Sequence, residues 1–303
     1  MRYTSRFMRF GGIEAGGTKW VCAVGEGGTA TLASETFATS TPDETVARAV
    51  EFLAGRGPLD ALGVGSFGPV DLRAGSPTWG RITTTPKPGW GGTDLAGMLH
   101  AALGVPLTLD TDVNAAALAE WRFGAARGLA TCCYVTVGTG IGGGAIVDGR
   151  PLHGLLHPEF GHMRIPRDAA RDPFDGCCPY HGDCLEGLAS GEALRRRWGR
   201  PAEELAGEDA VWELESEYLA LGLVNVVCTL SPQRIVIGGG VGGQAGLRQR
   251  TGRRLRALLA GYLDVAELTE PGAGEAYLVA PALGARAGVL GAIELARAAA
   301  GAA

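Results

Sequence analysis

The sequence predicts an α/β fold with mixed β-sheets, organised as two lobes. Short apolar segments typical of strands alternate along the chain with longer amphipathic segments typical of helices. Each half also begins with two apolar segments joined by a Gly-rich turn, which is the pattern of a β-hairpin. A chain of 303 residues is long enough for two domains of ordinary size. We therefore expect a ligand cleft between two lobes.

In the first half, residues 7–24 predict two strands joined by the turn Gly16-Gly17-Thr18. A helix is predicted over residues 41–54, because Thr41 suits the N-cap, Pro42 the first helical position, and Glu44 follows three residues after the cap. The next expected elements are a strand over 62–66, a loop over 79–90, a helix over 94–103, a strand over 105–110 and a helix over 114–123.

The second half opens with a hairpin predicted over 132–137 and 144–147. Helices are expected over 190–199, 209–230, 247–263 and 288–299, and strands over 234–237 and 277–280. The predicted domains are an N-terminal lobe over 1–118 and a C-terminal lobe over 119–289, with the last helix, about 290–303, packing back on the first lobe.

Composition excludes several classes of protein. A hydrophobic content of 46% with 19% charged residues indicates a globular protein with a good core. The net charge of −5 argues against nucleic acid or an acidic membrane as a partner. No apolar run is long enough for a membrane span, and the N-terminus lacks the apolar region of a signal peptide. Seven cysteines, an odd number without an export signal, favour the reducing cytoplasm.

A cluster of soft ligands lies between residues 157 and 190. His162, Cys178, His181 and Cys184 have the spacing H-x15-C-x2-H-x2-C. Four such ligands suit a tetrahedral Zn²⁺ site, and four protein ligands leave no open position for catalysis. We therefore expect a structural Zn²⁺ here, flanked by the carboxylates of Glu159 and Glu186.

Three Gly-rich turns follow predicted strands. Residues 14–19 combine two glycines with Thr18 and Lys19, and backbone N–H groups in such a turn can cradle phosphate oxygens. Residues 138–144 contain G-x-G-x-x-G but continue into a strand, which argues against a dinucleotide fold and fits a phosphate loop better. The third turn spans 238–243. Each could be an ordinary tight turn, but three at strand ends favour a shared phosphate-binding role.

Asp112 lies where a predicted strand runs into a predicted helix. In phosphoryl transfer a carboxylate accepts the proton of the attacking hydroxyl, and such a position exposes a side chain to a cleft. The alternative is that Asp112 only caps the helix. Strand alternation places Asp110 on the same face, so the spacing does not separate the two carboxylates.

These blocks together resemble the ROK family of sugar kinases, and within it the bacterial fructokinase branch. The resemblance covers essentially the whole chain in the family's order. The matching blocks are GGIEAGGTK (11–19), GSFGPV (65–70), TTTPKPGW (83–90), DTDVNAAALAE (110–120), VTVGTGIGGG (135–144), HPEFGHMRIPRD (157–168), CPYHGDCLEGLASG (178–191) and IVIGGGV (235–241).

The resemblance implies an actin-like (ribonuclease H-like) ATPase fold, with ATP and a sugar in a central cleft between two lobes. It also implies Mg²⁺ with the ATP, and a homodimer. By position it assigns the catalytic base to Asp112, ATP binding to Gly16, Gly17, Thr18, Lys19, Thr136, Gly138, Thr139, Gly140, Gly239 and Gly240, and sugar binding to Gly68, Pro69, Thr111, Asp112, Glu159, His162 and Glu186.

This sequence departs from the family pattern at a few positions. Glu14 stands where the family usually has Asp, and it is a candidate ligand of Mg²⁺, directly or through water. Thr111 stands where an Asn often contacts sugar hydroxyls. Pro179 replaces a cysteine of the glucokinase pattern, as in the fructokinase branch, and Cys177 is a spare thiol without an assigned role.

The resemblance therefore implies ATP-dependent phosphorylation of a hexose, with D-fructose converted to fructose 6-phosphate. Kinases for mannose, glucose or an N-acetylated hexosamine are the enzymatic alternatives. A sugar-binding regulator is the alternative outside enzymes. Such regulators carry an N-terminal DNA-binding domain, for which the residues before Glu14 leave no room.

Overall fold

The computed structural model describes residues 8–270 and 273–301. The chain separates into two compact units, each described by itself below. The first unit contains the described residues up to Phe123, the segment Pro151–His157 and the residues from Arg286 onward. The second unit contains Gly124–Arg150 and Pro158–Ala285. The first unit thus continues beyond residue 118, where the sequence suggested a boundary, to the end of a helix.

The first unit is built on a mixed five-stranded sheet with the order β3-β2-β1-β4-β5. β1 pairs antiparallel with β2 in the expected hairpin, and it pairs parallel with β4, which in turn pairs parallel with β5. The strands are β1 (Phe10–Ala15), β2 (Lys19–Gly25), β3 (Thr31–Ala38), β4 (Ala61–Ser66) and β5 (Leu107–Thr111).

Helices cover both faces of this sheet. α1 (Pro42–Ala54) and α2 (Leu95–Leu103) bury apolar residues against one face, in a core that contains Trp20 and Trp90. The expected cap of α1 is confirmed, since Thr41 Oγ1 accepts a hydrogen bond from the Glu44 amide at 3.4 Å. Asp94 caps α2 in the same way, at 3.1 Å from the Gly97 amide.

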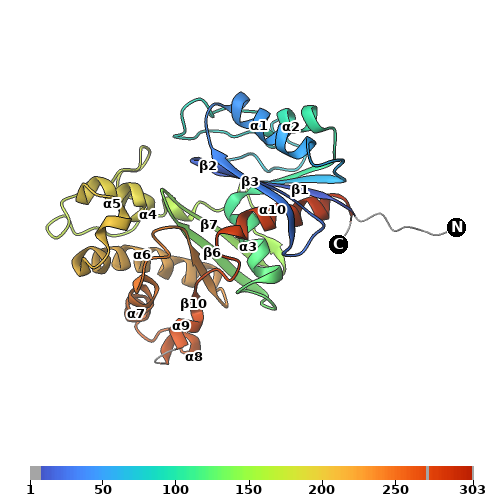
Figure 1. Ribbon diagram of the computed structural model, residues 1–303. Helices are drawn as coiled ribbons and strands as arrows, with labels where there is room; N and C mark the ends of the chain where they lie inside the picture. The colour runs from blue at the N-terminus through green and yellow to red at the C-terminus, as the bar shows by residue number, and fades with distance from the viewer. Residues whose placement is uncertain (1–7, 271–272, 302–303) are drawn as a thin grey trace. The chain divides into compact units, whose positions relative to one another are not determined.

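α10 (Ala287–Ala299) packs on the other face of the sheet, beside α3 (Asp112–Phe123) (Figure 1). The contact is close because β1 and β4 present glycines to the helix. A Cβ added to Gly63 would lie 1.9 Å from the Ala292 carbonyl oxygen, and one added to Gly12 would lie 2.7 Å from Ile293. The helix expected over 288–299 is therefore confirmed, and it belongs to the first unit.

The second unit contains a second five-stranded sheet with the order β10-β9-β6-β7-β8. The expected hairpin is β6 to β7, and β9 pairs parallel with β6. The strands are β6 (Thr131–Val137), β7 (Ile141–Val147), β8 (Arg150–Pro151), β9 (Ile235–Gly238) and β10 (Leu278–Val279), and the helices are α4 (Leu185–Ala189), α5 (Gly191–Trp198), α6 (Asp209–Leu230), α7 (Leu247–Leu259), α8 (Ala266–Thr269) and α9 (Ala273–Tyr277).

Several predicted boundaries in this unit were wrong. The hairpin turn is shorter than expected, because β7 starts at Ile141, where the glycines 142–144 still pair with β6. α7 ends at Leu259, before Ala260 and Gly261 adopt left-handed backbone conformations that stop a helix. The predicted strand over 277–280 is only two residues long, since Tyr277 ends α9.

Among the described residues, no helix combines the length and apolar character needed to cross a bilayer. α6, with 22 residues, is long enough, but it carries the carboxylates of Asp209, Glu213, Glu215 and Glu217.

Candidate functional site

The parallel strands of the first unit bring three predicted site segments to one sheet edge. Ala15 of β1 lies opposite Ser66 of β4, and Ser66 lies opposite Thr111 of β5. The three strands therefore end at the same level. The first Gly-rich turn follows β1, the Phe67–Val70 loop with Gly68 and Pro69 follows β4, and Asp112 follows β5. Loops after the carboxyl ends of parallel strands are a common place for ligands.

The first Gly-rich turn is held by a side chain from outside the hairpin. Thr39 Oγ1 donates to the Gly16 carbonyl oxygen at 2.7 Å, and the Thr39 amide donates to the Thr18 carbonyl oxygen at 2.9 Å. A Cβ at Gly16 would lie 2.8 Å from the Lys19 carbonyl oxygen, so the turn requires a glycine there. The Lys19 side chain is exposed at the end of the turn.

Glu14 lies just before this turn, with its carboxyl group packed against α10. Its Oε2 is buried and has no hydrogen-bond partner within the described part of the chain. A Cβ added to Gly288 would lie 2.4 Å from Glu14 Cδ. Burial raises the pKa of this carboxyl group, and the positive charge of Lys19 partly offsets that rise. A buried carboxylate oxygen of this kind is a suitable ligand for a hard cation such as Mg²⁺.

Asp110 and Asp112 occupy different environments. β5 ends at Thr111 and α3 begins at Asp112. The prediction that strand alternation places the two carboxylates on one face was therefore wrong. Asp110 is 3% exposed and accepts hydrogen bonds from the Thr111 amide at 2.7 Å and from Asn114 Nδ2 at 2.8 Å. His153 Nε2 also contacts this carboxylate. The Asp110 carboxylate therefore stabilises the junction between β5 and α3.

Thr111, rather than Asp112, provides the side-chain cap of α3. Thr111 Oγ1 accepts a hydrogen bond from the Asn114 amide at 3.1 Å. Asp112 is the first helical residue and is half-buried, with Oδ1 2.9 Å from the Val113 amide. Capping of α3, the alternative role considered for Asp112, is thus supplied by Thr111 instead.

His157 contacts the predicted sugar-binding loop 67–70, and sequence reasoning did not single it out. Its Nε2 accepts a hydrogen bond from the Val70 amide at 3.2 Å. A Cβ added to Gly68 would lie 3.3 Å from His157 Cε1, so the ring packs directly on the turn before the cis peptide bond Gly68–Pro69. His157 therefore holds the loop that follows β4. The only signal for it in the sequence was its place at the start of the block HPEFGH.

The second and third Gly-rich turns meet at one edge of the sheet of the second unit. Thr136 of β6 lies opposite Gly238 at the end of β9. The Val137 carbonyl oxygen accepts hydrogen bonds from the amides of Val241 and Gly242, both at 3.0 Å. Gly239 has φ +86°, and a Cβ there would overlap the Val137 backbone. Glycine is required at this position for both reasons.

The start of α5 fixes the turn 138–140. The Gly191 amide donates to the Gly138 carbonyl oxygen at 2.7 Å, and the Glu192 amide donates to the Thr139 carbonyl oxygen at 3.2 Å. Ser190 caps this helix through the Ala193 amide at 3.2 Å. The predicted ATP-binding turn is therefore built on the helix that follows the predicted metal segment.

Glu186, one of the two predicted sugar-binding carboxylates, contacts the same turn. Its Oε2 accepts a hydrogen bond from the Ile141 amide at 2.9 Å. A Cβ at Gly140 would lie 2.6 Å from that oxygen, so only glycine leaves room for the contact. Burial, with the nearby negative charge of Glu186 as a second cause, raises the pKa of Glu159 to about 7. Near neutral pH, Glu159 can thus donate or accept a hydrogen bond.

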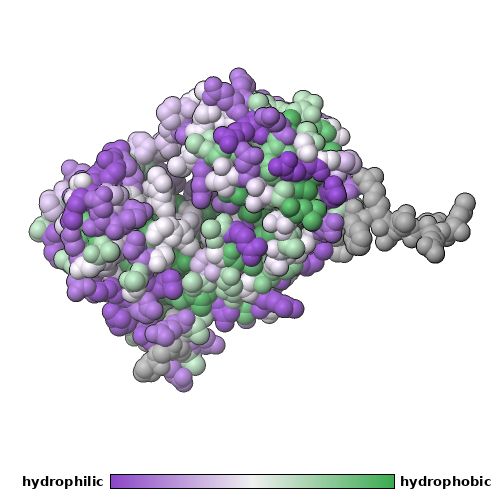
Figure 2. Space-filling view, in the orientation of Figure 1, coloured by the Kyte–Doolittle hydropathy of each residue, from purple (hydrophilic) through white to green (hydrophobic). Residues whose placement is uncertain are grey.

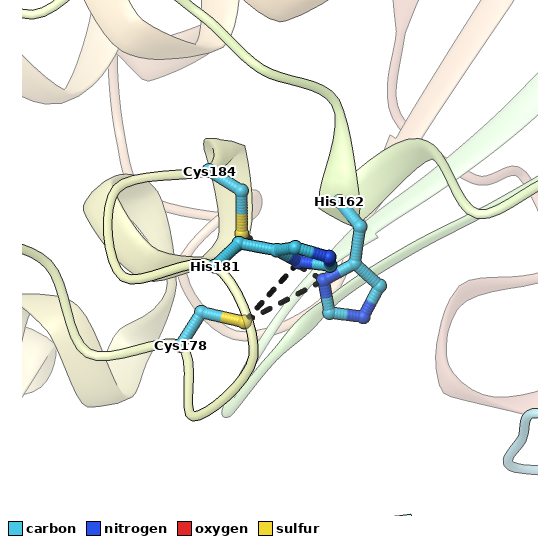
Figure 3. Close-up of side chains that lie close together, drawn as sticks. All are labelled: His162, Cys178, His181 and Cys184. Atoms are coloured by element: carbon cyan, nitrogen blue, oxygen red, sulfur yellow. Dashed lines mark hydrogen bonds between the residues drawn. The ribbon is translucent and has the colours of Figure 1, made fainter. Parts of the chain in front are cut away.

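The four predicted zinc ligands converge on one point (Figure 3). Their ligand atoms all lie within 4.8 Å of one another. Cys178 Sγ lies 3.7 Å from Nδ1 of both His162 and His181, and Cys184 Sγ lies 3.7 Å from His162 Nδ1. A tetrahedral Zn²⁺ with ordinary bond lengths separates sulfur and nitrogen ligands by about 3.6 Å. The donor set and its geometry therefore fit Zn²⁺, and Cys177 is outside the group.

With this geometry established, the comparisons with known proteins identify the family. A profile of the ROK family matches residues 10–299. The chain belongs to the ROK family. The family's actin-like ATPase fold is confirmed by the two α/β units and by the likeness to solved ROK structures. A ROK family glucokinase from Streptomyces griseus, solved with glucose and AMPPNP, has a TM-score of 0.76 at 26% identity, covering 96% of this chain and 99% of that chain.

Two curated ROK relatives are similar over most of their length. The fructokinase of Zymomonas mobilis subsp. mobilis is 46% identical over 302 residues, covering 96% of this chain and 97% of its own. The fructokinase of Lactococcus lactis subsp. cremoris is 41% identical over 256 residues, covering 84% and 87%. The expected membership of a family of sugar kinases is confirmed by these matches.

Proposed function

We propose that this protein transfers the γ-phosphate of ATP to D-fructose and forms fructose 6-phosphate. The observation that carries the proposal is the similarity to fructokinases over nearly the full chain, at up to 46% identity. The sheet edge of the first unit supplies the parts that such a kinase needs. It presents a Gly-rich turn, a carboxylate at a helix start and the 67–70 loop side by side.

Asp112 would accept the proton of the O6 hydroxyl as that oxygen attacks the γ-phosphorus. The bond from the γ-phosphorus to the β–γ bridging oxygen breaks, ADP leaves, and the proton stays on the carboxylate. The helix start suits this role, because the N-terminus of α3 stabilises a negative charge near it. Asp110 is less suitable, since it is buried and already bonded to Asn114 and His153.

The Gly-rich turns would bind the nucleotide. We assign phosphate contacts to Gly16, Gly17, Thr18 and Lys19 of the first unit. The matching assignment in the second unit is Thr136, Gly138, Thr139, Gly140, Gly239 and Gly240. Mg²⁺ bound with ATP neutralises charge on the phosphates, and Glu14 is the residue that would hold it. Backbone amides fixed in advance can stabilise the transferring phosphate without reorganisation.

The sugar would be bound by Glu159 and Glu186 of the second unit, with Gly68, Pro69 and Thr111 of the first. A carboxyl group whose pKa lies near 7 can donate to one sugar hydroxyl or accept from another. His162, Cys178, His181 and Cys184 would hold a structural Zn²⁺. That ion would fix the segment between Glu159 and Glu186, which precede and follow its ligands in the chain.

We also propose a homodimeric enzyme of the cytoplasm. None of the seven cysteines forms a disulfide bond with another, which fits a reducing compartment. The domain division at residue 118, with the last helix returning to the first lobe, remains our proposal for the functional lobes. The ligands that this function requires are ATP with Mg²⁺ and one hexose.

A coupled ADP-release assay over a panel of hexoses, with and without Mg²⁺, tests the function. We expect the highest kcat/KM with fructose, and no turnover without a divalent cation. A higher kcat/KM for mannose, glucose or N-acetylglucosamine would show that this sugar, and not fructose, is the preferred substrate. Binding of a sugar without any release of ADP would favour the regulator over the kinase.

A further inference from the structure

Helix α7 carries five arginines, and they fall into two groups with different surroundings. Arg250 and Arg254 face α6, where they form ion pairs with its acidic residues. Arg250 pairs with Asp209 at 2.6 Å and with Glu213, and Arg254 pairs with Glu213 at 2.9 Å. The charges of this first group are therefore balanced by α6.

Arg248, Arg253 and Arg256 form the second group, on the side of α7 that meets β10. Within the described residues none of the three has an ion-pair partner, and Arg256 donates only to the Glu270 backbone carbonyl at 2.8 Å. All three line a pocket of about 330 Å³, which we call the arginine pocket. Buried Leu278 of β10 contributes to its wall. Its volume is within the range of small-molecule sites.

The arginine pocket is strongly positive in a protein of net charge −5. Three guanidinium groups face a single carboxylate, that of Glu275. The surface over α7 is correspondingly hydrophilic (Figure 2). Keeping three like charges around one pocket costs free energy that an anion would recover. Guanidinium groups match the oxygens of phosphate especially well, because they donate two parallel hydrogen bonds.

We infer that the arginine pocket binds a small molecule through a phosphate group. A dianionic phosphate ester or an oligophosphate would balance the excess charge, and the pocket is too small for a folded partner. No residue of the pocket belongs to the Gly-rich turns, to Asp112 or to the predicted zinc ligands. The pocket therefore shares no lining residue with the machinery of the proposed function.

Titration calorimetry on the full-length enzyme tests this inference, with inorganic phosphate, tripolyphosphate and fructose 6-phosphate as probes. Saturating fructose fills the proposed sugar site, and sodium chloride keeps the ionic strength constant; MgADP is left out because its phosphates would compete for the arginine pocket. We expect at least one probe to bind at one arginine-dependent site per chain. The double variant R253A/R256A should weaken that binding by about tenfold or more, since each lost guanidinium removes a charge-assisted contact.

The matched control is R250A/R254A, which removes the same charge from the other side of the same helix. It should change the affinity less than about threefold, and thermal unfolding shows whether both variants remain folded. Equal losses in the two variants would mean general attraction to a basic helix and would overturn the site. So would the absence of binding by every probe. Because the two variants are compared with each other, any binding of a probe at the Gly-rich turns affects both equally, and the result does not depend on the proposed function.

Discussion

His153 Nε2 lies 3.0 Å from Asp110 Oδ2, and this contact fixes the segment Pro151–His157 to β5. The hydrogen bond that the His153 ring donates to Asp110 raises the pKa of His153 above its ordinary value, although partial burial acts in the opposite direction. The side-chain amide nitrogen of Asn114 also lies 3.4 Å from His153 Nε2. The imidazolium form is therefore favoured in the folded protein.

This contact predicts a pH-dependent contribution to stability. Because the folded pKa is raised, the contribution is full below about pH 6.5, the ordinary value, and is lost as pH rises through the folded pKa. His153→Gln should lower Tm more at pH 6 than at pH 8.5. The effect should stay below about 1 kcal/mol, since the His153 side chain is 42% exposed. Equal losses of Tm at both pH values would contradict the ion pair.

Asp112→Asn should lower kcat by about 10² to 10⁴-fold, because the amide cannot accept the proton of the sugar hydroxyl. Fructose binding, measured by calorimetry, should be retained. Asp110→Asn, two residues earlier in β5, is the matched comparison. It should mainly lower Tm, since it weakens the contacts to Asn114 and His153. An unchanged kcat in Asp112→Asn rules out its role as the base.

His157→Ala should raise KM for fructose and leave KM for ATP nearly unchanged. The substitution removes the hydrogen bond to the Val70 amide and the ring that packs on Gly68, so the 67–70 loop loses its support. His100→Ala, on the exposed side of α2, is the control and should change neither constant. Equal increases in both KM values would point to general destabilisation instead.

Gly140→Ala should lower Tm by several degrees, whereas Gly138→Ala should not. The added Cβ at position 140 would lie 2.6 Å from Glu186 Oε2, but at position 138 it meets nothing within 4 Å. Displacing Glu186 breaks its bond to the Ile141 amide, which costs about 1–3 kcal/mol when the donor is left unpaired. Similar Tm values in both variants would show that Glu186 moves aside freely.

Local patterns in the sequence were enough for much of this fold. Apolar periodicity and capping residues located the hairpins and the helices, because those signals lie within a few residues of one another. Strand register was not encoded in that way. The alignment of Ala15, Ser66 and Thr111 at one edge depends on parallel pairing between distant segments. Apart from the four clustered zinc ligands, the sequence suggested site residues singly, and only the sheets showed which of them lie together.

The contacts of His153 and His157 could not be found from spacing for the same reason. Each side chain reaches a strand or loop more than forty residues away, so no periodicity relates them to Asp110 or Val70. The wrong prediction that Asp110 and Asp112 lie on one face of a strand has a different cause. The rule of period two holds only inside a strand, and here the strand ends between the two residues.

Removal of the predicted metal gives the last test, and it distinguishes Cys184 from Cys177. Cys184→Ser should reduce bound zinc from about one per chain to much less, because Cys184 Sγ belongs to the group that converges with His162. Tm should fall and KM for fructose should rise together, since Cys184 also begins the helix that carries Glu186. Cys177→Ser should keep the zinc and the Tm, because Cys177 is outside the group. Zinc measured by atomic emission in both variants decides the assignment, and full zinc in Cys184→Ser would exclude this residue as a ligand.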